Sequence, residues 1–300
     1  SPKLINDTFH KIKEIKDIAF YNSWVENSLT QVYINAKTPP TIYENTLPAM
    51  YWNDSNIVIY VPYESTSSYA KANYFKNYTI NSIGSIYNYL YVYEIINNNQ
   101  VMITNYIGNE KELVIPDVFT IDGINYNVVA IKPDTFDGTS RLHTLTLGAY
   151  INNVGNGFLE NNNTIQNIYV DSNNQYFSSS DGVLYDYNKE TLIKYPRSKT
   201  LSDYTVLNTT KVISTKAFSN CSNLNTINLN NNLIAVSDSA FVNASGLKDI
   251  YFTSNTPPYL TGFEAFPMNA GLNIHHPVGA KDAYSTNVFF NWYSTYLIET

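Results

Sequence analysis

The sequence predicts a β-rich fold of the α/β class, a solenoid in which short coils of chain stack around one apolar core. Two observations lead to this prediction. An apolar pattern between positions 211 and 253 occurs twice at a distance of 23 residues, and the polar residues are mostly uncharged. Of the 300 residues, 42 are Asn and 27 are Tyr, whereas only 14% are charged. Because Tyr favours strands and Asn tolerates tight turns, this composition fits strands that are joined by many turns.

The two copies of the pattern share seven apolar positions at identical offsets. Their spacing follows neither the 3.6-residue period of a helix nor the 2-residue period of a strand over the whole copy. A coil with one strand, a corner made of a loop or short helix, and a second strand accounts for it. The apolar residues are Ile213, Ala217, Phe218, Cys221, Leu224, Ile227 and Leu229 in the first copy and Val236, Ala240, Phe241, Ala244, Leu247, Ile250 and Phe252 in the second.

The last strand of each copy is expected to turn one side to the core and the other to solvent. Ile227 and Leu229 are predicted to point inward, so that Asn228 between them points outward. Neighbouring strands lie about 4.8 Å apart, and equivalent side chains of successive coils therefore form columns. We predict one buried column of Phe136, Phe158, Phe218 and Phe241, and a candidate ligand-binding sheet face made of Thr144, Thr146, Asn167, Tyr169, Thr226, Asn228, Asp249 and Tyr251.

A looser copy of the pattern lies at the start of the chain, where Ala19 and Phe20 hold its central positions. It is followed by a different segment, which also occurs twice. The sequence Thr-Pro-Pro at 38–40 is repeated 218 positions later, and Tyr69 is repeated 215 positions later as Tyr284, which indicates a three-residue insertion or deletion between the two segments. Terminal repeats differ from internal ones because they cover the open end of the core. We therefore predict two C-terminal caps, whose prolines keep them out of a regular ladder of strands.

Two caps imply two arrays in tandem. Residues 1–83 are predicted to be the end of a first array with its C-terminal cap, and residues 84–300 a second array with an N-terminal hairpin cap and its own C-terminal cap. Residues 81–85 are predicted to be a linker between them. Alternating patterns around turn residues predict hairpins at 89–104 and about 122–123, and an inserted hairpin at 181–196.

Short motifs within the repeat carry a family resemblance. An Ala-Phe pair is followed by Ser-Asn-Cys-Ser-Asn-Leu at 219–224, and the inserted hairpin contains Asp-Gly-Val-Leu-Tyr and then Tyr-Pro. In these features the chain resembles the BspA-like leucine-rich repeats of bacterial surface proteins, over nearly all of residues 84–300 and more loosely over 1–83. Thr139 and Asn161 depart from the family at the Cys position. The resemblance implies a right-handed leucine-rich-repeat solenoid on a secreted or surface-anchored protein, often adhesive and without catalysis, but it transfers no ligand.

Charge and hydrophobicity argue against a nucleic-acid partner and against a transmembrane segment. The chain has a net charge of −7, a pI near 5.1 and no basic run, so it offers no surface that would replace the counterions of a nucleic acid. No apolar stretch approaches the roughly 18 residues of a membrane-spanning helix. Residues 1–7 lack the apolar core of a signal peptide and lie within a repeat, so we expect a mature or excised piece of a longer protein.

No catalytic, metal-binding or cofactor-binding residues are assigned from the sequence. The nucleophile motifs Gly-x-Ser-x-Gly and Ser-x-x-Lys are missing. Cys221 holds a small core position of the repeat, which predicts a buried thiol rather than a reactive one. His275 and His276 are adjacent in a strand-like segment and are expected to point to opposite faces, so they are not expected to share a metal ion. His276 stands where the other cap has Val61, which predicts a structural role.

The sequence thus favours a non-enzymatic extracellular protein, at the cell surface or secreted, that adheres to or binds another protein. A glycan-binding protein is the alternative, because Tyr169 and Tyr251 on the open sheet face are able to stack on sugar rings. A polysaccharide-degrading enzyme built on a solenoid is the third class. It would need a cluster of carboxylate or basic side chains on the sheet face, where the outward columns offer only Asp249.

Overall fold

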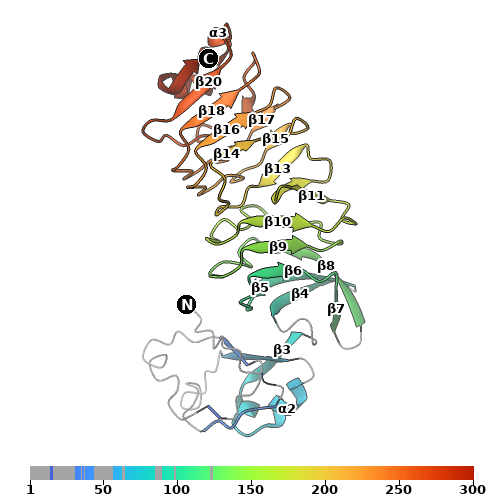
Figure 1. The fold of residues 1–300 in the computed structure, drawn as a ribbon. Helices are drawn as coiled ribbons and strands as arrows, with labels where there is room; N and C mark the ends of the chain where they lie inside the picture. Colours follow the sequence, from blue (N-terminus) through green and yellow to red (C-terminus); the bar gives the residue numbers. More distant parts are fainter. Residues whose placement is uncertain are drawn as a thin grey trace. The chain divides into compact units, whose positions relative to one another are not determined.

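A computed structural model describes residues 14–15, 31–34, 36, 38–43, 57–62, 65–84, 90–97, 99–121 and 124–300. These residues form a β-rich chain of short strands with a few short helices (Figure 1). The chain divides into two compact units, one of residues 1–108 with 118–127 and one of 109–117 with 128–300. The boundary expected between residues 83 and 84 stays a prediction. Ala19 and Phe20 lie outside the described residues.

The two clean copies of the repeat form two stacked coils, and each coil contributes one strand to each of two sheets, where it pairs in parallel with its equivalent in the other coil. The first copy contributes β15 (Val212–Ile213) and β16 (Thr226–Leu229), and the second contributes β17 (Ala235–Val236) and β18 (Asp249–Phe252). In the parallel register Ile213 lies opposite Val236, and Ile227 lies opposite Ile250. The predicted order of strand, corner and strand within one coil is therefore confirmed (Figure 1).

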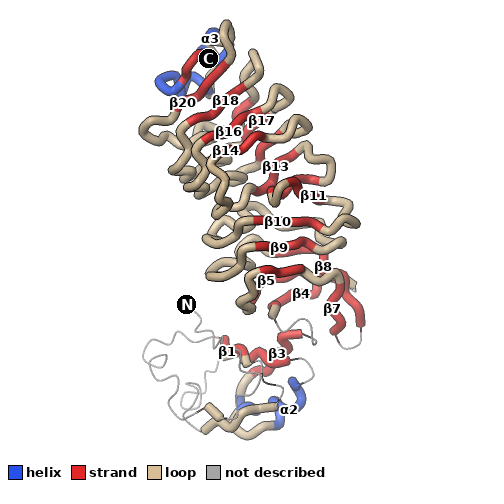
Figure 2. Tube along the Cα trace, in the orientation of Figure 1, coloured by secondary structure: helices blue, strands red, loops and turns tan. Residues whose placement is uncertain are grey.

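Other strands of the second unit extend these two sheets, and β6, β9 and β10 form a separate sheet. The five-stranded sheet has the order β14-β16-β18-β20-β21, and a three-stranded sheet has the order β10-β9-β6. The six-stranded sheet has the order β11-β12-β13-β15-β17-β19, and Figure 2 labels β11, β13 and β17 of it. The bounds are β6 Glu112–Val114, β9 Thr144–Leu147, β10 Asn167–Val170, β11 Phe177–Ser180, β12 Val183–Asp186, β13 Thr191–Lys194, β14 Asp203–Thr205, β19 Tyr259–Leu260, β20 Asn273–His276 and β21 Leu297–Glu299.

The aromatic rings of the core pack at the equivalent positions of the repeat, except that Tyr195 replaces one of the predicted phenylalanines as a neighbour of Phe218. Phe218 and Phe241 stack with ring centroids 4.6 Å apart and planes 4° from parallel. Phe136 and Phe158 are also in contact, at 6.4 Å and edge-on, and all four rings are buried. The ring that stacks on the other side of Phe218 is Tyr195, at 5.1 Å, which follows β13. The expectation of one continuous column is therefore wrong: the four rings form two pairs, and Tyr195 of the inserted hairpin, not Phe158, stacks on Phe218.

The corners of the coils are also in register. Lys216 and Asn220 flank Phe218 with φ angles of 60°, and their equivalents Ser239 and Asn243 have φ angles of 58° and 56°. Asn adopts this left-handed conformation more readily than most residues. The amide of Phe218 donates to the carbonyl of the next coil at Ala240 over 2.8 Å. Successive coils are therefore hydrogen-bonded at their corners as well as along their strands.

The duplicated segment folds in the same way in both places. In the first unit it contains β2 (Val58–Pro62), α2 (Thr66–Lys71), η3 (Phe75–Asn77) and β3 (Thr79–Gly84), after β1 (Gln31–Tyr33). In the second unit it contains β20, α3 (Lys281–Ser285), η4 (Phe290–Tyr296) and β21. We name residues 36–84 the N-terminal closing module and residues 254–300 the C-terminal closing module.

One conserved hydrogen bond shows how closely the two modules agree. The hydroxyl of Tyr69 donates to the carbonyl of Ala36, 33 residues earlier, and that of Tyr284 donates to the carbonyl of Ser254, 30 residues earlier, both over 2.9 Å. The difference of three residues is the insertion or deletion expected from the sequence. Tyr69 also meets Phe75 edge-on at 4.9 Å, as Tyr284 meets Phe290 at 5.1 Å.

Two expectations for these modules are wrong. The prolines do not keep the modules out of the ladder, since β2 pairs in parallel with β1 and β20 pairs in parallel with β18. Pro62 lies at the end of β2, beyond a register shift, and Pro277 follows β20, so neither interrupts the pairing. Residues 81–84 are not a linker, because they belong to β3 and pair with β2.

The predicted hairpins are confirmed. β4 (Tyr91–Asn97) pairs antiparallel with β5 (Gln100–Tyr106), and β7 (Val118–Ile121) pairs antiparallel with β8 (Ile124–Ile131). The inserted hairpin consists of β12 and β13, and Lys189 in its turn has a φ angle of 58°. The sequence pattern did not reveal β11, which pairs antiparallel with β12.

Candidate functional site

All eight residues of the predicted sheet face lie on strands, at the positions that alternate with buried ones. On β9, β16 and β18 the burial pattern alternates strictly between partly buried and buried residues. The inward side chains of these three strands are fully buried or nearly so, as Leu145, Ile227 and Ile250 illustrate. The predicted inward and outward directions are therefore confirmed, whereas a ligand-binding role for the outward residues is a proposal.

The eight residues form two separate groups rather than one continuous face. Thr144 and Thr146 on β9 lie opposite Asn167 and Tyr169 on β10, within the three-stranded sheet. Thr226 and Asn228 on β16 lie opposite Asp249 and Tyr251 on β18, within the five-stranded sheet. The inserted hairpin interrupts the columns between β10 and β14. The residues just before β12 lie next to β10 in place of another outward-facing strand, and the carbonyl of Gly182 accepts from the amide of Ile168 over 2.8 Å.

In the first group, the side chain of Asn167 is in contact with neighbouring residues and is less available to a ligand. Lys199 donates to the carbonyl of Asp181 over 2.5 Å and reaches Asn167 Oδ1 at 3.4 Å. A Cβ atom on Gly182 would come within 2.5 Å of the same Oδ1 atom, so the two chains lie in close contact there. Tyr169 remains 44% exposed, and it is the only large aromatic ring among the four residues of this group.

The second group is part of two longer columns on the outward side of the five-stranded sheet. One column is Asp203, Thr226, Asp249 and Asn273, and the other is Thr205, Asn228, Tyr251 and His275, in the register of four parallel strands. The columns are polar throughout, with one stacked pair of rings near their C-terminal end. The rings of Tyr251 and His275 lie 4.1 Å apart and 11° from parallel.

Asp249 is the centre of a hydrogen-bonded cluster on this face. Its Oδ1 atom lies 2.8 Å from His275 Nε2 and accepts from Asn273 Nδ2 over 3.1 Å. The other ring nitrogen of His275, Nδ1, is buried and has no hydrogen-bond partner among the described residues. The cluster therefore fixes the orientation of the His275 ring beneath Tyr251 while leaving one polar atom of that ring unused.

The electrostatics of the face favour ionised carboxylates. Partial desolvation acts to raise the pKa of Asp249, but the hydrogen bonds from His275 and Asn273 outweigh it, and the pKa of Asp249 is lowered. Hydrogen bonds from Ser202 and Thr226 lower the pKa of Asp203. The two acidic residues, which both belong to the first column, thus carry a negative charge near neutral pH.

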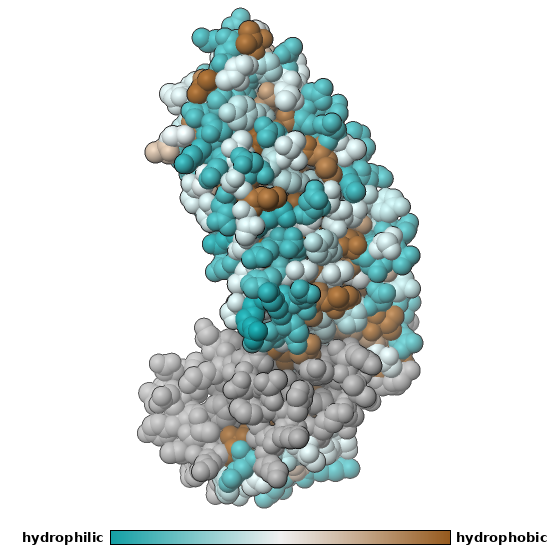
Figure 3. Space-filling view, in the orientation of Figure 1, coloured by the Kyte–Doolittle hydropathy of each residue, from teal (hydrophilic) through white to brown (hydrophobic). Residues whose placement is uncertain are grey.

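Such a face can bind a ligand by shape and hydrogen bonding. Hydroxyl, amide and carboxylate groups alternate over the sheet, and the partly exposed ring of Tyr251, which stacks on the buried ring of His275, adds an apolar surface that is already held in place. The described residues visible in Figure 3 are likewise mostly hydrophilic, with hydrophobic residues scattered among them. The described residues contain no group of three or more His, Cys, Asp or Glu side chains that could hold a metal ion.

The sequence pattern did not assign Asn273 and His275 to this face. Both lie in the C-terminal closing module, whose prolines were taken to exclude it from the ladder. The spacing contains the signal that would have found them, since His275 follows Tyr251 by 24 residues and a coil contains 23 or 24. Both histidines are buried, and His276 stacks on Tyr284 at 5.2 Å on the side of the core, as its structural interpretation predicts.

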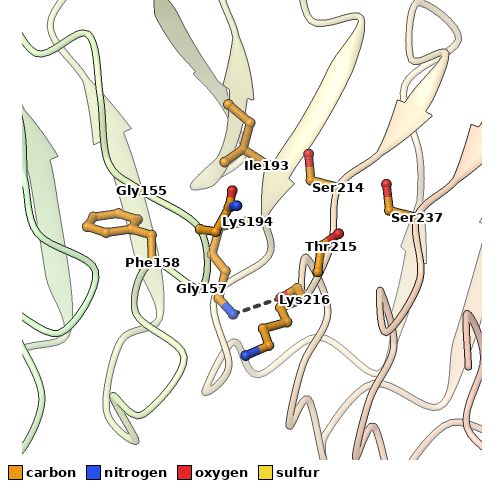
Figure 4. A pocket seen from close by; sticks show the side chains of 10 residues that line it. Gly155, Gly157, Phe158, Ile193, Lys194, Ser214, Thr215, Lys216 and Ser237 are labelled. Atoms are coloured by element: carbon orange, nitrogen blue, oxygen red, sulfur yellow. Dashed lines mark hydrogen bonds between the residues drawn. The ribbon is translucent and has the colours of Figure 1, made fainter. Parts of the chain in front are cut away.

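A small pocket lies elsewhere, at the corners of the coils, and contains a buried lysine that the sequence did not single out (Figure 4). Lys194 Nζ donates to the carbonyl of Lys216 over 3.0 Å and to Ser219 Oγ over 2.9 Å. Burial lowers the pKa of Lys194 to about 8. The pocket measures about 210 Å³, below the ~300 Å³ at which ligand sites usually begin. We assign Lys194 the structural role of joining two coils.

Cys221 is buried, as its place in the repeat predicts. Its Sγ atom faces the carbonyl of Ser219 at 3.7 Å. Burial raises the pKa of the Cys221 thiol to about 12, so the thiolate is not formed near neutral pH.

Comparison with known families decides the type of repeat. A family model of the BspA type leucine rich repeat region, with six copies, matches residues 119–200 and again 194–267. The chain is a leucine-rich repeat protein of the BspA type. The match covers the hairpin of β7 and β8, the inserted hairpin and both clean copies of the repeat. No curated protein matches the chain.

Solved structures of bacterial leucine-rich repeat proteins are similar to this BspA-type chain at low identity. One from Eubacterium ventriosum is 18% identical, with a TM-score of 0.47 over 88% of this chain and 70% of that one. The pneumococcal vaccine antigen PcpA is 14% identical, with a TM-score of 0.37 over 91% and 76%. A leucine rich cell surface protein from Faecalibacterium prausnitzii is 13% identical, with a TM-score of 0.27 over 70% and 92%.

Helices are few and short in the described part of this BspA-type chain. None of them has the length and apolar character that crossing a membrane requires.

Proposed function

We propose that this BspA-type protein is a non-enzymatic binding protein of the cell surface or the secreted fraction, and that it adheres to a partner protein through the outward side of its five-stranded sheet. The observation that carries the proposal is the pair of polar columns on β14, β16, β18 and β20, with the stacked rings of Tyr251 and His275 among them. Rigid aromatic anchors surrounded by hydrogen-bonding groups are typical of protein interfaces.

The repeat type supports an extracellular, adhesive role, since BspA-like repeats are those of bacterial surface proteins. The sheet supports it physically, because its outward residues are already ordered by the ladder. A partner that docks on them therefore meets side chains that lose little conformational freedom on binding.

The test is binding of the whole chain to a panel of immobilised extracellular matrix proteins, followed by surface plasmon resonance. We expect Tyr251→Ala to weaken binding at least tenfold, because it removes one ring of the stacked pair. Tyr169→Ala is the matched control, since Tyr169 is an outward tyrosine of the three-stranded sheet. Equal binding by the wild-type chain and Tyr251→Ala would contradict the proposal.

A glycan is the second candidate ligand, favoured by the exposed ring of Tyr169 and the partly exposed ring of Tyr251. A glycan array with the same two variants separates the two classes of ligand. Sugar binding that is lost in either variant would favour a glycan-binding function. Turnover of a polysaccharide would instead reveal an enzyme and would contradict both.

A further inference from the structure

Four aromatic side chains form a connected cluster on the surface of the C-terminal closing module. The ring of Phe289 lies 5.8 Å from that of Tyr259 and 5.0 Å from that of Phe263, and Phe263 lies 5.6 Å from Trp292. Tyr259, Phe263 and Trp292 are 58%, 48% and 57% exposed. We call these four residues the aromatic patch. Tyr259 belongs to β19, the last strand of the six-stranded sheet, and none of the four lies on the five-stranded sheet that carries Tyr251.

The fold of the module does not require the two outer rings of this patch. In the N-terminal closing module, Thr41 stands in place of Tyr259 and Asn77 in place of Trp292, and both are exposed. The buried pair of Tyr69 and Phe75 nevertheless packs as its counterpart does in the other module. The outer rings are therefore an addition to a surface that folds without them. Exposed apolar groups that gather in this way commonly mark a binding surface.

Two carboxylates border the aromatic patch. Glu264 follows Phe263, and its backbone amide donates to Asp238 Oδ1 over 3.1 Å, so the loops after β17 and β19 lie side by side. Tyr293 joins this border to η4, because its hydroxyl donates to the carbonyl of Phe263 over 2.5 Å. In the described part of the chain, neither Asp238 nor Glu264 forms an ion pair with a Lys, Arg or His. The negative charges of Asp238 and Glu264 are thus not balanced by an ion pair with a cationic side chain among the described residues.

From this juxtaposition we infer that the aromatic patch, together with Asp238 and Glu264, is a second docking site, which takes a segment of a partner protein in which Arg or Lys is flanked by apolar residues. A guanidinium or ammonium group is attracted both to carboxylates and to the face of a Trp or Tyr ring. The apolar neighbours in the partner segment would cover Phe263 and Trp292. Trp, Tyr and Arg are also the residues that contribute most to binding at protein interfaces.

The geometry favours a protein segment over the other possible occupants. Rings in contact within the patch are inclined to each other by 89°, 51° and 60°, so they form an uneven surface rather than one flat platform for a sugar ring. A second copy of this chain has a net charge of −7 and would bring like charges to the acidic border. A basic segment complements both the shape and the charge.

The test uses the full chain and fluorescence anisotropy with three labelled synthetic peptides of equal length. The first alternates Arg with Leu and Ile, the second has citrulline in place of each Arg, and the third has Glu. We expect the Arg peptide to bind, the citrulline peptide to bind at least tenfold more weakly and the Glu peptide not to bind. Affinity for the Arg peptide should fall as salt is added, because the attraction is partly ionic.

The variants take their residues from the other module. Tyr259→Thr with Trp292→Asn should keep the melting temperature and weaken Arg-peptide binding at least tenfold. Asp238→Asn with Glu264→Gln leaves the rings in place and keeps an acceptor for the Glu264 amide, and it should remove most of the salt dependence. Tyr251→Ala, on the five-stranded sheet, should bind the Arg peptide as the wild-type chain does, so this test stands apart from that of the proposed function.

Several results would overturn the inference. They are equal affinity for the Arg and Glu peptides, unchanged Arg-peptide affinity in the Tyr259→Thr and Trp292→Asn double variant, and absence of binding to all three peptides. Light scattering that shows a dimer in the wild-type chain and a monomer in the double variant would assign the patch to a second copy instead. Glycan-array binding that is lost in the double variant would assign it to a sugar.

Discussion

The N-terminal and C-terminal closing modules are two versions of one structure with different surfaces. Both contain a strand, a short helix, a 3-10 helix and a final strand, and both bury a Tyr and a Phe in edge-on contact. On the surface, Thr41 and Asn77 of one correspond to Tyr259 and Trp292 of the other. Covering the end of a stack of coils therefore constrains the buried residues and leaves the outer ones available for binding.

The largest effect is expected from the buried ring that the two modules share. Phe290→Ala should destabilise the C-terminal module by roughly 3–5 kcal/mol, because it leaves a cavity between Phe252, Phe266 and Tyr284. Urea unfolding measures the loss, with Phe75→Ala as the matched change in the other module. A loss below about 1 kcal/mol for Phe290→Ala, with a normal loss for Phe75→Ala, would show that the two cores are not equivalent.

The shared tyrosine hydroxyl should have a smaller effect. Tyr284→Phe leaves the carbonyl of Ser254 without the donor that lies 2.9 Å away, at a cost of roughly 1–3 kcal/mol. Tyr69→Phe should cost a similar amount, since its hydroxyl makes the equivalent bond to Ala36. Thermal melting of the two variants checks this. Melting temperatures equal to that of the wild-type chain would mean that neither bond contributes.

A pH effect is expected where the C-terminal closing module pairs with β18, because His275 stands there in place of Tyr60 of the other module and bonds to Asp249. Hydrogen bonds from His275 and Asn273 lower the pKa of Asp249 in the folded chain despite partial desolvation. A lowered folded-state pKa means that this stabilisation is present above the unfolded pKa, about 3.9, and is lost as the pH falls through the folded-state value.

Asp249→Asn should therefore lower the melting temperature at pH 6 and have less effect at pH 3. The melting temperatures of both proteins at the two pH values are the measurement. Thr205→Val is the control, because this outward residue of the neighbouring column accepts a hydrogen bond from the amide of Asn228 rather than bonding to a carboxylate, and it should show no such pH dependence. An effect of Asp249→Asn that is equal at both values would contradict the lowered pKa.

The smallest effect on stability should come from the surface that differs between the modules. Trp292→Asn should change the free energy of unfolding by less than about 0.5 kcal/mol, because the ring is exposed and the other module folds with Asn77 in its place. Urea unfolding tests it. A loss above 2 kcal/mol would show that the aromatic patch is part of the core rather than a docking site.

The spacing of apolar residues was sufficient to predict the coils, the inward direction of Ile227 and Leu229, and the burial of Cys221. It succeeded because a repeat buries the same offsets in every coil, so each copy supports the interpretation of the next. The hairpins were predictable for a local reason, since turn residues and alternation lie within one short segment.

Prediction failed where a strand has no local pattern of its own. The segment of β20 was excluded from the ladder on account of Pro277, yet the proline lies just past the strand and leaves its hydrogen bonds intact. As a consequence His275 and Asn273 were missed in the candidate site. The break between the two groups of sheet-face residues was missed as well, since it depends on where the inserted hairpin packs.

The amino-acid sequence alone determined that this chain is a stack of leucine-rich coils, since a repeated apolar pattern can be buried in only a few ways. It also determined which side chains point away from the core. Only the tertiary structure decided which of these outward residues meet. The contact of Tyr251 with His275 and that of Phe263 with Trp292 join residues from different elements, and the distance between such residues depends on how the coils and the closing module pack together.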